Sequence, residues 1–164
     1  MEVQQLKKED LANCANLIIK AYNGRPWNYQ WTFSKASLYL NELFESSRFV
    51  GFVIYEGDEL VGAMFAHVKT WWIDDQLMID ELFVSAQEQG KGYGQTLMNT
   101  TKEYANNNNI GSITLMTQKY MPALSFYEKN SFLKAEQYVL MFLESAGRQA
   151  HKNIMTLLLL SAIV

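Results

Sequence analysis

Three glycines at alternate positions, Gly90, Gly92 and Gly94, mark the segment whose residue types say most about chemistry. They lie between an apolar run at 77–84 and a stretch with helical character at 95–105. Glycine has no Cβ, so the backbone can adopt positive φ angles and a ligand can approach main-chain N–H groups closely. A helix N-terminus adds unpaired donors and the positive end of the helix dipole. Strand, loop and helix together therefore predict a site for an anion such as a pyrophosphate.

Two common phosphate-binding loops do not fit these letters. A Walker loop needs Ser or Thr after its lysine, but Gly92 follows Lys91. The dinucleotide fingerprint Gly-x-Gly-x-x-Gly has a different glycine spacing. The pattern that fits is Gln-x-x-Gly-x-Gly, which runs from Gln89 to Gly94 directly after the segment 79–84.

This loop resembles the acyl-CoA loop of the GNAT superfamily of N-acetyltransferases. A second segment, residues 122–132, is similar to that superfamily's later Ala-x-x-Phe-Tyr-Glu-Lys-x-Gly-Phe segment and follows in the right order. The resemblance covers residues 2–143, which we expect to form one domain. It implies the α/β (α+β) GNAT fold, with a mixed, mostly antiparallel central sheet flanked by helices. It also implies an enzyme that uses acetyl-CoA as co-substrate and transfers the acetyl group to a primary amine by direct attack in a ternary complex.

The resemblance places the cofactor mainly against backbone. It implies that main-chain groups of Leu82, Phe83 and Val84 align the pantetheine and the acetyl carbonyl, as an added strand would. The pyrophosphate would bind amides of the loop, which comprises Gln89, Gly90, Lys91, Gly92, Tyr93, Gly94 and Gln95. The side chains of Leu82 and Val84 can pack in the core at the same time, because the binding groups are main-chain.

Acetyl transfer from a thioester to an amine needs a proton donor for the departing thiolate and a neutral amine. Tyr127 occupies the position where the superfamily commonly has a tyrosine near the cofactor sulphur, which implies the role of acid. A tyrosine that only packs or binds the cofactor is the alternative. In the same segment, Ser131 stands where the superfamily has glycine, so either Ser131 or Asn130 must adopt the left-handed turn that closes the helix.

Asp80 and Glu81 are the candidates for handling the amine. They are neighbours on an expected strand, so alternation predicts that they point to opposite faces of the sheet and that only one faces a given cleft. Alternation places Glu81 with Ile79 and Phe83. The resemblance implies a general base on this strand, and Glu81 can serve either as that base or as a carboxylate that binds the cationic amine. We expect Asp80 to have the lesser role, in substrate binding.

Aromatic residues and carboxylates suggest what the acceptor is. Trp27, Tyr29, Trp31 and Trp72 lie in two loops that border the acceptor cleft in proteins of this fold. Aromatic faces and carboxylates together suit a small cationic molecule, such as an aminoglycoside or a polyamine. For any single aromatic residue, packing between loop and sheet is the simpler explanation. A protein or peptide N-acetyltransferase and a non-catalytic acyl-CoA-binding module stay open as alternatives.

The elements that must position these groups alternate between strand and helix. Val3 and Leu6 suggest a first strand, and Asp10 can cap a helix with apolar residues at helical spacing. Ser34 is the expected cap of a second helix, whose expected inner residues are Leu38, Leu40, Leu43 and Phe44. Strands are predicted at 49–55, 60–69, 76–84 and 112–117, with a hairpin turn at 56–59 and a left-handed helix exit at 106–111.

Composition excludes several classes of protein. The 164 residues are 49% hydrophobic and 19% charged, which predicts a folded chain with a packed core. A net charge of −3 disfavours nucleic acid as a partner. One cysteine permits no internal disulfide, and the two histidines are isolated, so we expect no metal site. The N-terminus lacks the features of a signal peptide, so we expect a cytoplasmic enzyme.

The C-terminal tail, residues 144–164, stands outside the resemblance. Its last eleven residues, 154–164, are almost wholly apolar. This run is shorter than the roughly 20 residues that span a bilayer. We therefore expect the tail to pack, either over core surface or against a second subunit in a homodimer.

Overall fold

The computed structural model describes residues 2–141 and 143, arranged in two compact units. The first unit ends at Met116 and the second begins at Thr117. Each unit is described by itself below. The predicted C-terminal tail at 144–164 lies outside the described residues.

A five-stranded sheet forms the centre of the first unit, in the order β1-β2-β3-β4-β5. The strands are β1 (Glu2–Gln5), β2 (Phe49–Glu56), β3 (Glu59–Lys69), β4 (Gln76–Val84) and β5 (Ser112–Leu115). Neighbours are antiparallel except β4 and β5, which are parallel. A parallel pair needs a crossover connection, and the helix α3 (Tyr93–Asn107) supplies it. The mixed, mostly antiparallel sheet that was predicted is confirmed.

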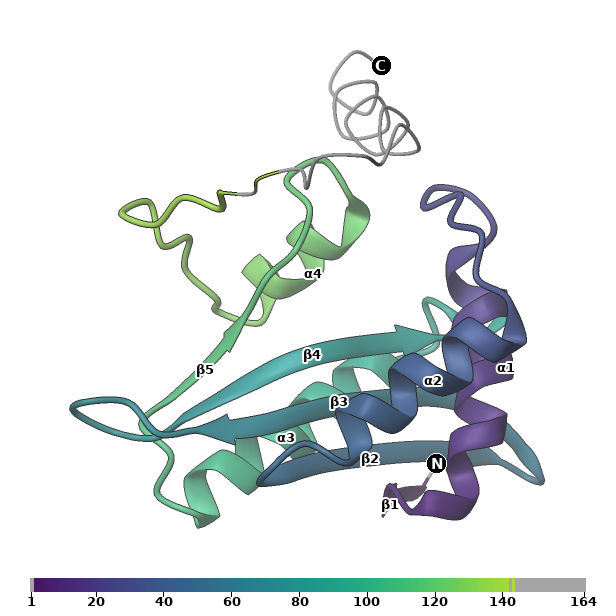
Figure 1. Cartoon of the computed structure of the whole chain (residues 1–164), viewed down its shortest axis with the longest axis horizontal. Coiled ribbons are helices and arrows are strands. Elements are labelled where there is room, and N and C mark those ends of the chain that lie inside the picture. The colour runs from purple at the N-terminus through teal and green to yellow at the C-terminus, as the bar shows by residue number, and fades with distance from the viewer. Residues whose placement is uncertain (1, 142, 144–164) are drawn as a thin grey trace. The chain divides into compact units, whose positions relative to one another are not determined.

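Helices cover both faces of this sheet (Figure 1). The helices α1 (Leu11–Tyr22) and α2 (Phe33–Phe44) lie over one face, and α3 lies on the other. The core under α1 and α2 includes Ile18 and Leu40 of the helices and Phe65 and Phe83 of the strands. Both helices are amphipathic, so burying their apolar stripes against the sheet removes those side chains from water.

Two helix caps differ from the sequence prediction. The Asp10 side chain makes no cap bond to α1; it accepts hydrogen bonds from Lys7 N and from the hydroxyl of Tyr55. The cap of α2 is Thr32, whose Oγ1 accepts from Lys35 N, so Ser34 lies inside the helix. Both Thr32 and Ser34 are good cap residues, and the chain geometry selects between them.

The prediction that Leu38 lies on the inner side of α2 is also wrong. Leu38 is 61% exposed, whereas Leu40 is fully buried. Helical spacing explains the difference, because Ala36 and Leu40 lie four residues apart on the buried side while Leu38 lies between them on another side. Leu43 and Phe44 pack against the core as predicted.

The second unit contains the helix α4 (Pro122–Lys129). Proline at its first position suits a helix start, because that N–H has no helical partner. Ser131 adopts the left-handed geometry, with φ of 69°, so it is Ser131 and not Asn130 that closes this helix in place of a glycine. No helix in the described part of the chain is long and apolar enough to cross a membrane.

The exposure of Leu38 and the burial of Leu40 give a matched test of α2 packing. Leu40→Ala should lower the free energy of unfolding by about 2 to 5 kcal/mol, because it leaves a cavity in the core. Leu38→Ala should change it by less than about 0.5 kcal/mol. Chemical denaturation followed by circular dichroism measures both. Equal losses in the two variants would contradict the placement of α2.

Candidate active site

A β-bulge at Asp80 sets the geometry of β4. On β3, Ala66 pairs with Ile79 and Phe65 pairs with Glu81, so Asp80 is an extra residue without its own partner. Such a bulge shifts the alternation of side chains by one position. Glu81 therefore shares a face with Phe83, as predicted, but not with Ile79.

Asp80 and Glu81 consequently lie on the same face of the sheet. Glu81 contacts α1 and α2, while Asp80 Oδ2 lies 2.8 Å from Nδ1 of His67. His67 is two residues from Phe65 on β3, which places it on the face that α1 and α2 cover. The prediction that Asp80 and Glu81 point to opposite faces is wrong, because it assumed an unbroken strand.

Two tyrosines hold the carboxylate of Glu81. The hydroxyl of Tyr22, at the end of α1, donates to Oε2 at 2.9 Å, and the hydroxyl of Tyr39, in α2, donates to Oε1 at 2.8 Å. Burial raises the pKa of Glu81, and the charge of Asp80 raises it further, while the two phenol hydrogen bonds act in the opposite direction. Burial and the Glu81 charge in turn raise the pKa of Tyr39. The result is a half-buried carboxylate of fixed orientation.

Sequence reasoning missed Tyr22 and Tyr39, although helical spacing could have found them. Tyr22 continues the buried stripe of α1 that contains Ala15 and Ile18. Tyr39 lies three residues after the buried Ala36 on α2. A tyrosine on a buried stripe needs a partner for its hydroxyl, and an acid on the facing strand can provide one.

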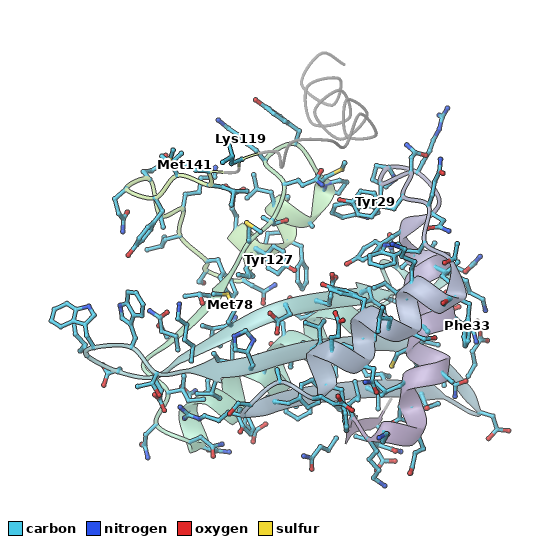
Figure 2. All side chains as sticks on the ribbon, in the orientation of Figure 1. Tyr29, Phe33, Met78, Lys119, Tyr127 and Met141 are labelled. Atoms are coloured by element: carbon cyan, nitrogen blue, oxygen red, sulfur yellow. The ribbon has the colours of Figure 1, made fainter. Side chains whose placement is uncertain are left out.

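The aromatic loop between α1 and α2 packs onto these two tyrosines. Rings of Trp27 and Tyr29 lie 5.3 Å and 5.9 Å from the ring of Tyr22, and Trp31 stacks on Tyr39 at 5.2 Å. Figure 2 shows Tyr29 on this loop. The loop is held because the Asn23 side chain both donates to Trp31 O and accepts from Trp31 N.

Trp72 lies elsewhere. It is 83% exposed, in the turn between β3 and β4. That turn is at the opposite end of the sheet from the α1–α2 loop (Figure 1). The neighbouring acid Asp75 forms an ion pair with Arg48. The structure therefore brings Trp27, Tyr29 and Trp31 to the carboxylates of β4, and it does not bring Trp72 to them.

The glycine loop joins β4 to α3 with an open backbone. Gly90 and Gly92 have φ of 80° and 92°, the left-handed values that glycine adopts without strain. No atom would lie within 4 Å of a Cβ at either position. The first bond of the helix runs from Thr96 N to Gly92 O, so α3 begins directly after the loop. The amides of that first turn point toward the loop at the positive end of α3.

Two side chains of the glycine loop are held by glutamates. Lys91 Nζ lies 2.7 Å from Glu88, and the Tyr93 hydroxyl donates to Glu56 at 2.6 Å. The hydrogen bond to Glu56 raises the pKa of Tyr93 to about 12. These contacts keep both side chains beside the loop and leave its backbone exposed.

Near the glycine loop, β4 extends beyond its pairing with β5. Pairing with β5 ends at Ile79 and Leu115, but β4 continues to Val84. Within residues 2–116, the stretch from Asp80 to Val84 has a strand partner only in β3. Phe83 and Val84 are buried, so their side chains pack in the core while their main chain forms this edge. An extended ligand could pair with such an edge as an added strand would.

Comparison with known proteins decides the family. The model of the acetyltransferase (GNAT) family matches residues 16–132, which include β4, the glycine loop and α4. The chain belongs to the acetyltransferase (GNAT) family. This confirms the predicted family and the predicted class of enzyme. The GNAT family generally uses acetyl-CoA.

Solved structures support the GNAT fold. A transcriptional regulator from Bacillus halodurans C-125 is similar with a TM-score of 0.71 and 19% identity, over 87% of this chain and 99% of that one. A Trypanosoma brucei acetyltransferase is similar with a TM-score of 0.63 and 17% identity, over 87% of this chain and 99% of that one. A third similar structure is an aminoglycoside acetyltransferase from an uncultured soil metagenomic sample, in complex with sisomicin. Its TM-score is 0.66 at 17% identity, over 88% of this chain and 95% of that one. At these identities the likeness shows the fold alone. No curated protein matches the sequence.

The predicted acid of the GNAT segment, Tyr127, lies in the second unit. Its ring contacts Phe126 and Phe132 edge-on, with centroids 5.3 Å and 5.6 Å away. Its carbonyl accepts from Phe132 N at 3.1 Å, so the chain folds back over the helix end. These contacts fix the ring within this unit.

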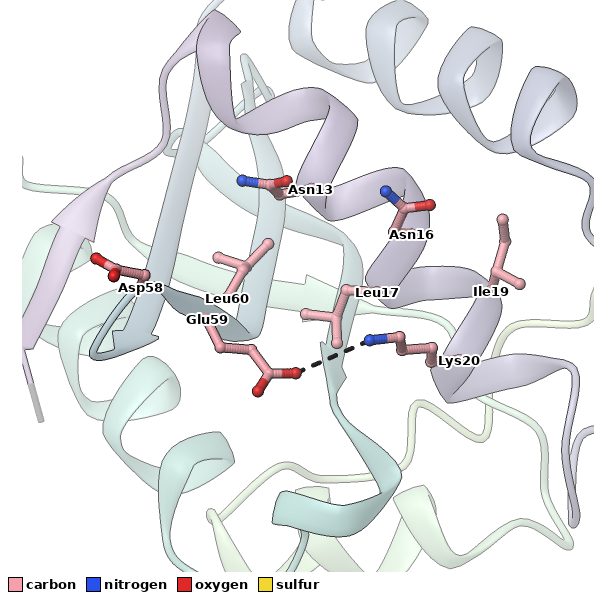
Figure 3. A pocket seen from close by; sticks show the side chains of 8 residues that line it. All are labelled: Asn13, Asn16, Leu17, Ile19, Lys20, Asp58, Glu59 and Leu60. Atoms are coloured by element: carbon pink, nitrogen blue, oxygen red, sulfur yellow. Dashed lines mark ion pairs between the residues drawn. The ribbon is translucent and has the colours of Figure 1, made fainter.

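A separate pocket of about 600 Å³ lies between α1 and the β2–β3 turn (Figure 3). Leu17 and Leu60 form its apolar part, and Lys20 and Glu59 form an ion pair across it. It contains none of the residues predicted for the GNAT active site. We therefore place the candidate active site at β4 and the glycine loop, and not in this pocket.

The two phenol hydrogen bonds to Glu81 can be tested by titration. Tyr22→Phe and Tyr39→Phe each remove a donor that stabilises the charged carboxylate, so each should raise the pKa of Glu81 further. Carboxyl carbon shifts in NMR report the titration. The control is Tyr120→Phe, at an exposed tyrosine of the second unit. An unchanged pKa of Glu81 in both variants would contradict the two hydrogen bonds from Tyr22 and Tyr39.

Proposed function

We propose that the protein transfers an acetyl group from acetyl-CoA to a primary amine of a small cationic molecule, of aminoglycoside or polyamine type. The observation that carries this proposal is the pair of carboxylates, Asp80 and Glu81, on one face of β4. They lie beside the aromatic loop between α1 and α2. Aromatic faces and carboxylates attract ammonium groups, and the attraction grows where water is excluded.

The cofactor is proposed to bind along β4 and at the glycine loop. The main chain from Leu82 to Val84 would pair with the pantetheine as an added strand. Amides from Gln89 to Gln95 would hold the pyrophosphate at the N-terminus of α3. Acetyl-CoA supplies the activated thioester, and the backbone at this edge orients it toward the acceptor.

Glu81 is proposed to bind the acceptor ammonium. Each of its oxygens already accepts a phenol hydrogen, which fixes the carboxylate and leaves its charge available to a cation. Tyr127 is proposed to protonate the departing thiolate, as its match to the family segment implies. A direct attack in a ternary complex then needs no covalent enzyme intermediate.

A panel of amines tests the proposed substrate class. Free-thiol release from acetyl-CoA should be fastest with polyamines or aminoglycosides and slow with uncharged amines. Glu81→Gln should raise KM at least about tenfold for cationic acceptors only, since about 1.4 kcal/mol of attraction is lost. Because its pKa is raised, acidification should neutralise Glu81 and raise this KM at a pH above the usual range of a glutamate.

Other results of the panel would overturn the proposal in different ways. Preference for peptides would favour a protein N-acetyltransferase, and preference for uncharged acceptors would contradict the cationic site. If the protein bound acetyl-CoA and released no thiol with any amine, a non-catalytic acyl-CoA-binding module would replace the enzyme.

Gly94 tests the cofactor loop. Gly94→Val should abolish acetyl-CoA binding, measured by calorimetry, because its side chain would occupy the space that the pyrophosphate needs beside the first turn of α3. Glu103→Val, at an exposed position further along the same helix, introduces the same side chain away from the loop and should bind acetyl-CoA normally. Retained affinity in the Gly94 variant would reject the loop as the binding site.

Tyr127 tests the proton donor. Tyr127→Phe should lower kcat about a hundredfold, a typical contribution of general acid catalysis, with little change in acetyl-CoA affinity. Tyr120→Phe, also in the second unit, should leave kcat unchanged. A Tyr127 variant with the normal rate would assign the thiolate proton to another source.

A further inference from the structure

His67 and Asp80 form an acid–base pair that the sequence analysis did not predict. Nδ1 of His67 lies 2.8 Å from Oδ2 of Asp80, and their side chains are 30% and 17% exposed. The two residues come from neighbouring strands, and the bulge supplies the geometry that lets them meet. The imidazole of His67 is therefore hydrogen-bonded to a carboxylate and also reaches solvent.

This pair lies on the same face as Glu81 but differs from it in chemistry. Both oxygens of Glu81 accept hydrogens from phenols, which give up protons only at high pH. Asp80 instead contacts an imidazole, a ring in which one nitrogen donates a hydrogen and the other can accept one. Glu81 is thus suited to attract an ammonium group, whereas the Asp80–His67 pair is suited to move a proton.

We propose that His67, held by Asp80, accepts the proton that the acceptor's ammonium group must lose before it attacks. This inference rests on the proposed function. The Nδ1–H of neutral His67 is donated to the Asp80 carboxylate, which leaves Nε2 as the acceptor nitrogen. The N–H bond of the ammonium breaks and its proton passes to Nε2 of His67. The products are a neutral amine and an imidazolium paired with the Asp80 carboxylate. The amine lone pair then forms the amide bond while the C–S bond breaks, and the imidazolium releases its proton to solvent.

The titratable groups of the cluster that contains His67 and Glu81 come from several elements. From β4 they are Asp80 and Glu81, from α1 Tyr22, and from α2 Tyr39. The β2 residue that pairs with His67 is Phe49, which carries no charge, and the preceding Arg48 forms an ion pair with Asp75. In the described part of the chain, the imidazolium formed in this step therefore has Asp80 as its direct ion-pair partner.

The pH dependence of turnover tests this role. For the wild type, kcat should fall on acidification, as for any reaction that needs an unprotonated general base. His67→Gln should lower kcat at neutral pH about a hundredfold and should lose this acid limb, while KM stays within about twofold. Added imidazole should restore part of the rate in His67→Ala, because the position reaches solvent. His151→Gln, at the only other histidine of the chain, should reproduce the wild-type profile.

Each other outcome has a definite meaning. Acetyl-CoA affinity equal to that of the wild type shows that the His67 variants are folded. If such a folded His67→Gln variant kept the wild-type acid limb, or lost rate equally at every pH without rescue by imidazole, the role of His67 as base would be overturned and His67 would be structural. If the wild type turned over no amine at all, the proposed function would fall and this proposal with it.

Discussion

The one-residue bulge at Asp80 is the constraint on which the candidate site depends. Before it, Ile79 pairs with Ala66; after it, Glu81 pairs with Phe65. A regular strand would send adjacent acids to opposite faces. With the bulge, Asp80 and Glu81 share one face, and the main chain of β4 continues beyond the end of β5 as an edge. The proposed acceptor-binding carboxylates and the proposed cofactor-binding edge therefore come from the same five residues of one strand.

The helices on that face complete the site by controlling the environment of Glu81. Placing a carboxylate under α1 and α2 disfavours its charged form, because water is removed. Hydrogen bonds from Tyr22 and Tyr39 offset part of this cost, since hydrogen bonds to a charged acceptor are stronger than neutral ones. The aromatic loop then packs on the same two tyrosines. Loop, helices and strand are thus coupled through one side chain.

Much of the fold could be predicted because its patterns are local. The turn at Gly57-Asp58 between β2 and β3, the strand before the glycine loop and the loop's own backbone geometry follow from nearby residues. The bulge could not be predicted, because it is defined by the pairing of β4 with β3. The same reason explains the missed His67–Asp80 pair, whose members lie thirteen residues apart on two strands. Leu38 was misplaced by an error of helical phase, because the side of α2 that is buried in the core contains Ala36 and Leu40.

A crystal structure with coenzyme A and an unreacted polyamine bound would test the central claim most directly. Our account predicts an ammonium nitrogen about 2.7 to 3.2 Å from a carboxylate oxygen of Asp80 or Glu81. It also predicts that the pantetheine lies along the main chain from Leu82 to Val84. A polyamine bound on the other face of β4, or at the exposed turn that contains Trp72, would contradict the account.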